Sequence, residues 1–267
     1  MKLKRRFVEK PWGETVLPDI FQADSGKKIG EIWFEAPKGI SPQLMIKYLF
    51  TSEKLSIQVH PDDQQARRMG FPHGKEESWL ILHAESWATL GIGLVKEVQP
   101  SELREAIISD KMENLLDWKP VSAGDIFHIP AGTVHAIGPG IVLLEVQQNI
   151  DLTYRLYDYG RPRELHIEGA LNVAALRPYD MNNHSKIPAD QSAMLVDSPY
   201  FRIFQIIGDD IEPLTGIEAT EWQLISLDGN VKVCGTPIEI GECGICASQA
   251  DIDMSNNRKA IIACTTK

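Results

Sequence analysis

The chain contains 267 residues, of which 43% are hydrophobic and 24% are charged, and its formal net charge is −10. This length and composition are typical of a globular protein with one large or two modest domains. The acidic balance argues against sequence-independent binding of nucleic acid, which requires clustered Lys and Arg. An anionic substrate would need a local basic pocket.

Targeting signals and cysteine usage indicate a cytoplasmic protein. Residues 1–13 are basic, but no apolar segment follows them, so we expect no secretion signal. No apolar run approaches the roughly 18 residues that a membrane helix needs. Reduced thiols are therefore expected. Cys243 and Cys246 form a CxxC pair, but Cys234 and Cys264 stand alone, so we expect the thiols to pack rather than to bind a metal.

Short β-like runs separated by Gly, Pro and Asp dominate the first part of the chain. Their close spacing predicts a mainly β protein, built as a sandwich or barrel. Helical periodicity is limited to residues 166–176 and residues 100–118, where we expect one broken helix or two short ones with Ser101 as a candidate N-cap. The β-like runs occupy residues 28–36, 44–50, 54–60, 77–84, 125–131 and 141–148.

The pattern changes after Leu176. Residues 177–193 are polar and contain two prolines, which predicts a linker. Strand-like runs then resume, and the segment Leu-Asp-Gly-Asn at 227–230 predicts a hairpin turn. We therefore expect a first domain over residues 1–180 and a smaller β-domain over residues 181–267.

Four polar side chains form a candidate metal site. Gln58 and His60 lie two residues apart in a strand that breaks at Pro61, so their side chains share one face. Glu77 opens an apolar strand, and His135 follows a Pro-Ala-Gly turn. These ligand types suit Zn²⁺, with Fe²⁺, Mn²⁺ or Co²⁺ also compatible, and ligands from different strands would converge inside a barrel. Taken alone, each has an alternative as a packed core or surface side chain.

Several motifs recur in the order found in a known family. The segments "QVHP" and "PAGTVH" resemble the metal-binding pattern of cupin barrels. The chain further resembles the type I phosphomannose isomerases (mannose-6-phosphate isomerases) over residues 8–178, through "KPWGE", "LSIQVHPDD", "GKEESWLIL", "GDIFHIPAGTVHAIG" and "LLEVQQNIDLTYRLYDYGRPRELHIEGAL". The short segment between Glu77 and His135 indicates the short form of the family. The resemblance implies a jelly-roll barrel with a few short helices, followed by a smaller cupin-like domain without a metal.

The resemblance also implies an activity and a set of site residues. It implies a zinc-dependent isomerase, with one zinc per chain, that interconverts mannose 6-phosphate and fructose 6-phosphate through an enediol. The implied metal ligands are Gln58, His60, Glu77 and His135. The implied catalytic residues are Arg155, Glu145 and Lys75, and the implied contacts to the substrate phosphate are Lys47 and Ser56. A carboxylate or lysine can move the proton, and an arginine or metal can steady the charge that builds on oxygen.

Alternatives stay open at this point. Arg155 could be a structural ion-pair partner, Lys47 and Lys75 could be surface lysines, and the proton-transfer base is not fixed. The chain could also be a non-catalytic cupin that binds a metal or a sugar, or another metal-dependent cupin enzyme such as an oxygenase or a related sugar isomerase. The expected partner is a small sugar phosphate, with no nucleic acid and no membrane, and the oligomeric state is left open.

Overall fold

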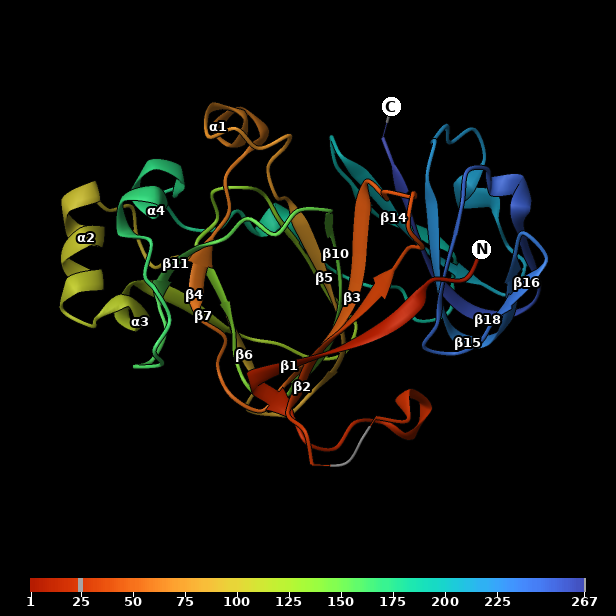
Figure 1. Ribbon diagram of the computed structural model, residues 1–267, viewed down its shortest axis with the longest axis horizontal. Coiled ribbons are helices and arrows are strands. Elements are labelled where there is room, and N and C mark those ends of the chain that lie inside the picture. The colour runs from red at the N-terminus through yellow and green to blue at the C-terminus, as the bar shows by residue number, and fades with distance from the viewer. Residues whose placement is uncertain (24–25, 267) are drawn as a thin grey trace.

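The computed structural model describes residues 1–23 and 26–266 and confirms a mainly β protein. Its largest sheet has seven antiparallel strands in the order β1-β2-β3-β10-β5-β8-β12. Figure 1 shows this sheet at the centre of the molecule. The strands are β1 Lys4–Glu14, β2 Ile29–Glu35, β3 Leu44–Thr51, β5 Glu77–Ala84, β8 Asp125–Ile129, β10 Ile141–Gln148 and β12 His184–Lys186.

A second sheet of five strands faces the first and closes the barrel. Its order is β11-β4-β9-β6-β7. Apolar side chains from both sheets, such as Phe127 and Leu143 from the first and Leu90 and Ile92 from the second, share one core cluster. The strands are β4 Ile57–Val59, β6 Thr89–Leu94, β7 Leu116–Pro120, β9 His135–Ile137 and β11 Tyr154–Tyr157.

Both faces of the inner strands β3, β5 and β10 of the seven-stranded sheet are buried, which explains why these strands are nearly continuously apolar. Along β5, Trp79 and Ile81 point into the barrel, whereas Leu80 points to the other side. Successive side chains of a strand alternate between its two faces. By the same alternation, a charged residue at Glu77 faces the barrel interior, where burial makes it costly unless it is paired.

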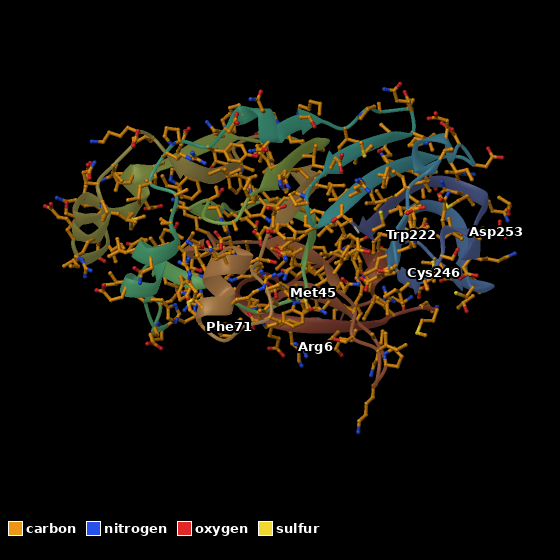
Figure 2. The ribbon with its side chains drawn as sticks, turned by 90° about the horizontal axis from the view of Figure 1, so that it is seen from above. Arg6, Met45, Phe71, Trp222, Cys246 and Asp253 are labelled. Carbon is orange, nitrogen blue, oxygen red and sulfur yellow. The ribbon has the colours of Figure 1, made fainter. Side chains whose placement is uncertain are left out.

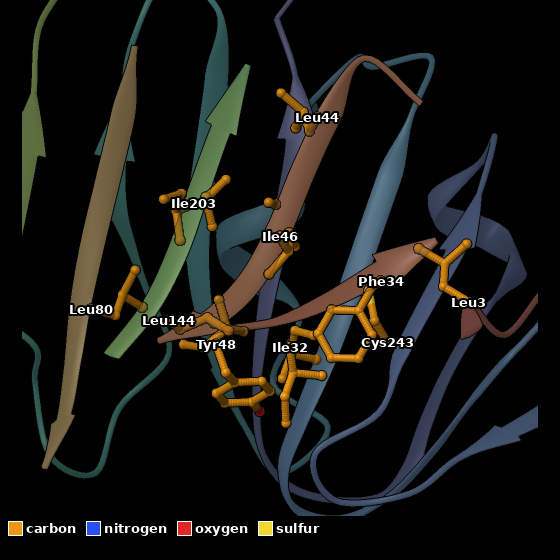
Figure 3. Packing of buried hydrophobic residues seen from close by; sticks show 14 of the residues in the cluster. Leu3, Ile32, Phe34, Leu44, Ile46, Tyr48, Leu80, Leu144, Ile203 and Cys243 are labelled. Atoms are coloured by element: carbon orange, nitrogen blue, oxygen red, sulfur yellow. The ribbon is translucent and has the colours of Figure 1, made fainter. Parts of the chain in front are cut away.

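The strands after residue 192 form a third sheet, called the second domain below, which packs against the outer face of the seven-stranded sheet. Leu44, Ile46 and Tyr48 of β3 meet Ile203 and Cys243 of the second domain in one core cluster, as Figure 3 shows from close by. The third sheet has the order β13-β14-β18-β15-β16, with β17 paired to β15. Its strands are β13 Ala193–Asp197, β14 Phe201–Ile207, β15 Trp222–Val233, β16 Thr236–Ile238, β17 Cys243–Cys246 and β18 Ile252–Thr265.

The first residues of the chain also belong to this second domain. The backbone N–H of Leu3 donates to the carbonyl oxygen of Cys243, and the N–H of Ile245 donates to that of Met1, both at 2.8 Å. Figure 1 accordingly shows the N-terminus beside the C-terminal strands. The third sheet therefore contacts the barrel domain at the N-terminal end of that domain, through residues 1–3, as well as following it in the chain.

Short helices cover the outer face of the five-stranded sheet, at the left of Figure 1. Of the two possibilities for residues 100–118, the structure shows two short helices, but Ser101 is not the N-cap. The helix begins at Pro100, whose missing N–H costs nothing in a first turn, and Gln99 is the N-cap. No helix of the described residues is long and apolar enough to cross a membrane. The α-helices are α1 Asp63–Arg68, α2 Pro100–Ile108, α3 Met112–Leu115 and α4 Ile167–Val173.

The predicted linker at residues 177–193 is partly ordered structure. Within it, β12 pairs with β8 of the barrel. Asp125 Oδ1 lies 2.8 Å from both His184 Nε2 and Lys186 Nζ, and the His184 ring stacks on Phe127. These contacts fasten the segment to the first domain. The exact division of the chain after residue 180 stays a prediction.

The predicted hairpin turn at residues 227–230 is wrong. The chain continues there as β15, with register shifts against β18. Gly229 has φ +84°, and a Cβ on it would lie 2.6 Å from backbone atoms of β18, so this is a bulge that only glycine fits. The hairpin lies at Cys234 and Gly235, which join β15 to β16 with φ of 50° and 73°. Two consecutive residues with positive φ form the tight turn that a hairpin prefers.

Candidate active site

Three buried side chains, one just after a strand and two at the start of other strands, form a group that can hold a metal ion, called the metal group below. His60 directly follows β4, Glu77 opens β5 and His135 opens β9. One ligand atom from each lies within 4.8 Å of the others, and the described part of the chain holds no second group of this kind. The barrel thus brings together three of the four residues that the sequence singled out as ligands.

Hydrogen bonds on the far side of each ring prepare the two histidines as ligands. His60 Nδ1 lies 2.9 Å from the carbonyl oxygen of Leu152, and His135 Nδ1 lies 2.8 Å from that of Thr133. Because a carbonyl oxygen only accepts, Nδ1 carries the proton in both rings and Nε2 presents its lone pair to the centre. Burial lowers the pKa of both imidazoles, which keeps them neutral.

The third residue of the metal group, Glu77, is an ionised carboxylate, and its Oε2 accepts no hydrogen bond from the described residues. Burial alone would raise the pKa of Glu77, but the Lys75 ammonium, 3.2 Å from Oε2, holds it well below its usual value. Among the described residues, none donates a hydrogen bond to Oε2, although this atom is buried. A bound cation would satisfy that oxygen. Two neutral imidazoles and one carboxylate are a donor set that suits zinc.

Gln58 stands at the edge of this group. It lies on β4 directly opposite His135 on β9, and its Nε2 is 3.3 Å from His135 Nε2. Its Oε1 lies 3.4 Å from the hydroxyl of Ser56, the residue predicted to contact phosphate. Rotation of the Gln58 side-chain amide by 180° exchanges its oxygen and nitrogen with little change in shape. The oxygen can therefore equally face the metal group.

Buried charged residues surround the metal group. Lys75 Nζ lies 3.3 Å from His60 Nε2, and Lys47 Nζ lies 3.0 Å from Glu145 Oε1. Both lysines are at most 7% exposed, so the alternative that they are surface lysines is wrong. Burial and the neighbouring charge of Glu77 raise the pKa of Glu145, although Lys47 opposes this shift. A carboxyl group with a raised pKa is suited to exchange a proton near neutral pH.

Arg155 lies across from Gln58 in the β11–β4 pair. Its Nη1 donates to the carbonyl oxygen of Glu164 at 2.8 Å, and its buried Nε has no partner among the described residues. No acidic side chain of the described residues forms an ion pair with it, in contrast to the alternative of a structural pair. Burial and the nearby Arg163 lower the pKa of Arg155, which nevertheless stays charged because guanidinium is so basic.

These residues line one cavity of about 220 Å³. From the predicted set, its wall contains Lys47, Ser56, Gln58, Lys75, Glu77, Glu145 and Arg155. A deep polar cavity with convergent charges and one metal group is a suitable site for chemistry on a small polar molecule.

The same wall contains residues that sequence analysis did not single out, among them Lys10, Glu31, Trp33 and Arg163. Glu31 and Trp33 alternate along β2 with residues that pack against the second domain. Strand alternation therefore contained the signal that they face the barrel. The signal was hidden because the two residues lie in no family motif, and a charged residue such as Glu31 usually faces solvent.

Cys243 and Cys246, the CxxC pair of the sequence, do not converge on one point. Cys243 and Cys246 are three residues apart on β17, so they point to opposite faces and pack in two different clusters. Figure 2 labels Cys246 and Trp222, which lie opposite each other on β17 and β15. Cys264 is buried as expected, but Cys234 is exposed in the hairpin turn. The prediction that it packs is therefore wrong.

His128 also has partners that the sequence did not reveal. Its Nδ1 lies 2.9 Å from Ser78 Oγ, and its Nε2 lies 3.2 Å from Glu76 Oε1. Ser78 and Glu76 flank Glu77 and, by strand alternation, face away from the cavity. His128 therefore packs behind the metal group and is not part of it.

Known proteins with similar sequences are mannose-6-phosphate isomerases, whereas no family model matches the chain. The mannose-6-phosphate isomerase of Streptococcus mutans is 36% identical over 183 residues, which cover 66% of this chain and 57% of that protein. The mannose-6-phosphate isomerase ManA of Bacillus subtilis is 30% identical over 239 residues, which cover 74% of this chain and 76% of that protein. The chain thus spans little more than half the length of the first relative.

Solved structures agree over nearly the whole chain. The crystal structure of the mannose 6-phosphate isomerase from Bacillus subtilis has a TM-score of 0.76 and 26% identity, and covers 98% of both chains. A variant of the phosphomannose isomerase from Salmonella typhimurium has a TM-score of 0.70 at 14% identity, which supports the fold alone. The expected cupin fold is therefore confirmed. On the identity and coverage of the Bacillus relative, the chain belongs to the mannose-6-phosphate isomerase family.

Proposed function

We propose that the protein interconverts mannose 6-phosphate and fructose 6-phosphate with the help of one bound zinc ion. The observation that carries this proposal is that Glu77 of the metal group and the buried carboxyl group of Glu145 line one cavity. The names of the relatives supply the substrate. His60, Glu77 and His135, with Gln58, would hold the zinc, which would polarise the carbonyl group of the substrate.

The reaction moves a proton between C2 of the aldose and C1 of the ketose. One group must take the proton from the first carbon and return it to the second. We assign this role to Glu145, because its raised pKa lets it both accept and release a proton. The ammonium of Lys75 and the free guanidinium edge of Arg155 would donate to the oxygens on which negative charge builds in the enediol.

The charge of the cavity fits an anionic substrate. The protein is acidic overall, so a phosphate dianion needs cations close by. Lys47 and Ser56 stay the predicted phosphate contacts. Lys47 would have to share its ammonium between the phosphate and its partner Glu145, 3.0 Å away.

A coupled assay tests the proposal. Zinc-loaded protein should form fructose 6-phosphate from mannose 6-phosphate, chelator-treated protein should not, and added zinc should restore turnover. Glu145→Gln should keep its zinc and lose about 10²- to 10⁴-fold in kcat, the usual loss for a proton-transfer group. A folded, zinc-loaded sample without turnover would refute the proposal and favour a metal- or sugar-binding cupin.

A further inference from the structure

Three neighbouring strands carry charged side chains into the cavity side by side. Lys47 on β3 stands opposite Glu145 on β10 and diagonally next to Glu31 on β2. Its Nζ lies 3.0 Å from Glu145 Oε1 and 3.9 Å from Glu31 Oε1. All three side chains are buried. One buried ammonium therefore serves two buried carboxyl groups.

Glu31 is fixed by two further donors. Trp33 Nε1 donates to Glu31 Oε2 at 2.7 Å, and Lys10 Nζ lies 3.3 Å from the same oxygen. Oε2 is thus committed to these partners, while Oε1 is the oxygen nearer to Lys47. Lys10 is partly exposed, so it connects the buried row of charges to the cavity mouth.

The two carboxyl groups that flank Lys47 differ in proton affinity. Burial disfavours ionisation of both, but Lys47 and Lys10 together lower the pKa of Glu31. For Glu145, burial and Glu77 prevail over Lys47 and Lys75, and the pKa is raised. The contacts of the two acids differ as well, because Trp33 and Lys10 hold Glu31, whereas Lys47 is the one cation paired with Glu145 among the described residues.

Resting on the proposed function, we propose that Glu31 is a positioning residue that shares the Lys47 ammonium with Glu145 and thereby keeps Glu145 able to take up a proton. If Glu31 loses its charge, Lys47 is left to Glu145 alone and favours its carboxylate form. If Lys10 loses its charge, Glu31 attracts Lys47 more strongly, and Glu145 binds a proton more readily. The two changes therefore act in opposite directions, which a purely structural role would not produce.

The titration of Glu145 in the metal-loaded protein tests this directly. The protein is produced with glutamate that carries ¹³C at the side-chain carboxyl carbon, and the chemical shifts are followed by NMR as the pH changes. The Glu145 signal is assigned by its loss in Glu145→Gln. Glu31→Gln retains an oxygen acceptor for Trp33 Nε1 and should lower the titration midpoint by about 0.5 units or more. Lys10→Met should raise it.

The matched control is Glu35→Gln on the same strand. Glu35 is 41% exposed and pairs with Arg6, so its removal should leave the midpoint unchanged. Glu31→Asp, which keeps the charge, should move the midpoint less than Glu31→Gln. Midpoints that stay constant in Glu31→Gln and Lys10→Met, or that move in the same direction, would overturn the proposal.

Activity provides a second readout. The acidic limb of the pH profile of kcat/KM should move with the Glu145 midpoint in each variant, at unchanged zinc content. A limb that does not follow the midpoint would contradict the role of Glu31 in turnover. If the wild-type protein does not turn over mannose 6-phosphate, the proposed function fails, whereas the carboxyl titration still decides whether Glu31 controls Glu145.

Discussion

Gln58 and His135 face each other directly across β4 and β9, with their side-chain nitrogens 3.3 Å apart. One cross-strand pairing therefore positions two candidate metal ligands at once. A slip of either strand by a single residue would turn its ligand out of the barrel. The candidate metal site thus depends on strand register as much as on the side chains that would bind the ion.

The first prediction concerns metal retention. His60→Ala and His135→Ala should each lose bound zinc, because each removes a ligand that no neighbour can replace. Metal analysis after gel filtration measures zinc per chain. His83→Ala is the control, since that side chain is 62% exposed on β5. Full zinc occupancy in His60→Ala would refute the ligand assignment.

The second prediction concerns Arg155. Arg155→Ala should keep its zinc and lose about 10²-fold or more in kcat, the scale of a lost donor to a developing charge. Arg155→Lys should recover only part of the rate, because lysine lacks the planar fork of guanidinium. A near-normal kcat with a raised KM would instead mean that Arg155 only binds the substrate.

The third prediction concerns the cysteines. The double variant Cys243→Ala and Cys246→Ala should carry as much zinc per chain as the wild type, because the two thiols lie on opposite faces of β17. Its Tm should fall, since both side chains are buried in apolar clusters. Loss of one zinc equivalent would reveal a structural metal in the second domain.

The fourth prediction concerns the segment that joins the domains. Burial alone would raise the pKa of Asp125, but Lys186 and His184 lower it below its unfolded value. The carboxylate therefore stabilises the fold above about pH 4, and this contribution is lost as the pH falls through the lowered pKa. Urea unfolding should show Asp125→Asn less stable than wild type at pH 7, and the difference should shrink below about pH 4.

A suitable control for this prediction is Asp117→Asn. Asp117 pairs with Lys119 of the same strand, β7, and is 34% exposed, so its replacement should change stability little. A stability difference for Asp125→Asn that does not depend on pH would show that the hydrogen-bond geometry matters and the charge does not.

The metal group was predictable because each ligand lies in a short motif with strong local signals. Glu31 was not, because its role depends on the diagonal contact with Lys47 across β2 and β3. Such contacts depend on which strands become neighbours, and sequence periodicity does not specify that. The same limit explains why Lys47 and Lys75 had two possible readings until the barrel interior was known.

The wrong hairpin prediction at residues 227–230 shows a second limit of sequence analysis. The segment with Asp228 and Gly229 has hairpin composition, yet it forms a bulge inside a long strand, while Cys234 and Gly235 form the turn. Both sites need a glycine with positive φ. The pairing of β15 with β18 on either side of Gly229 decides between them, and that pairing is a tertiary contact.

The hydrogen bonds of Met1 and Leu3 with β17 affect how the chain can fold during synthesis. Residues 1–3 wait for partners that are made more than two hundred positions later, as the separation of 244 between Met1 and Ile245 illustrates. Contacts of such long range form slowly, because a large loop must close before they contribute any stability. The strands of the barrel can therefore pair before residues 1–3 do, because these residues find their partners only when β17 has emerged.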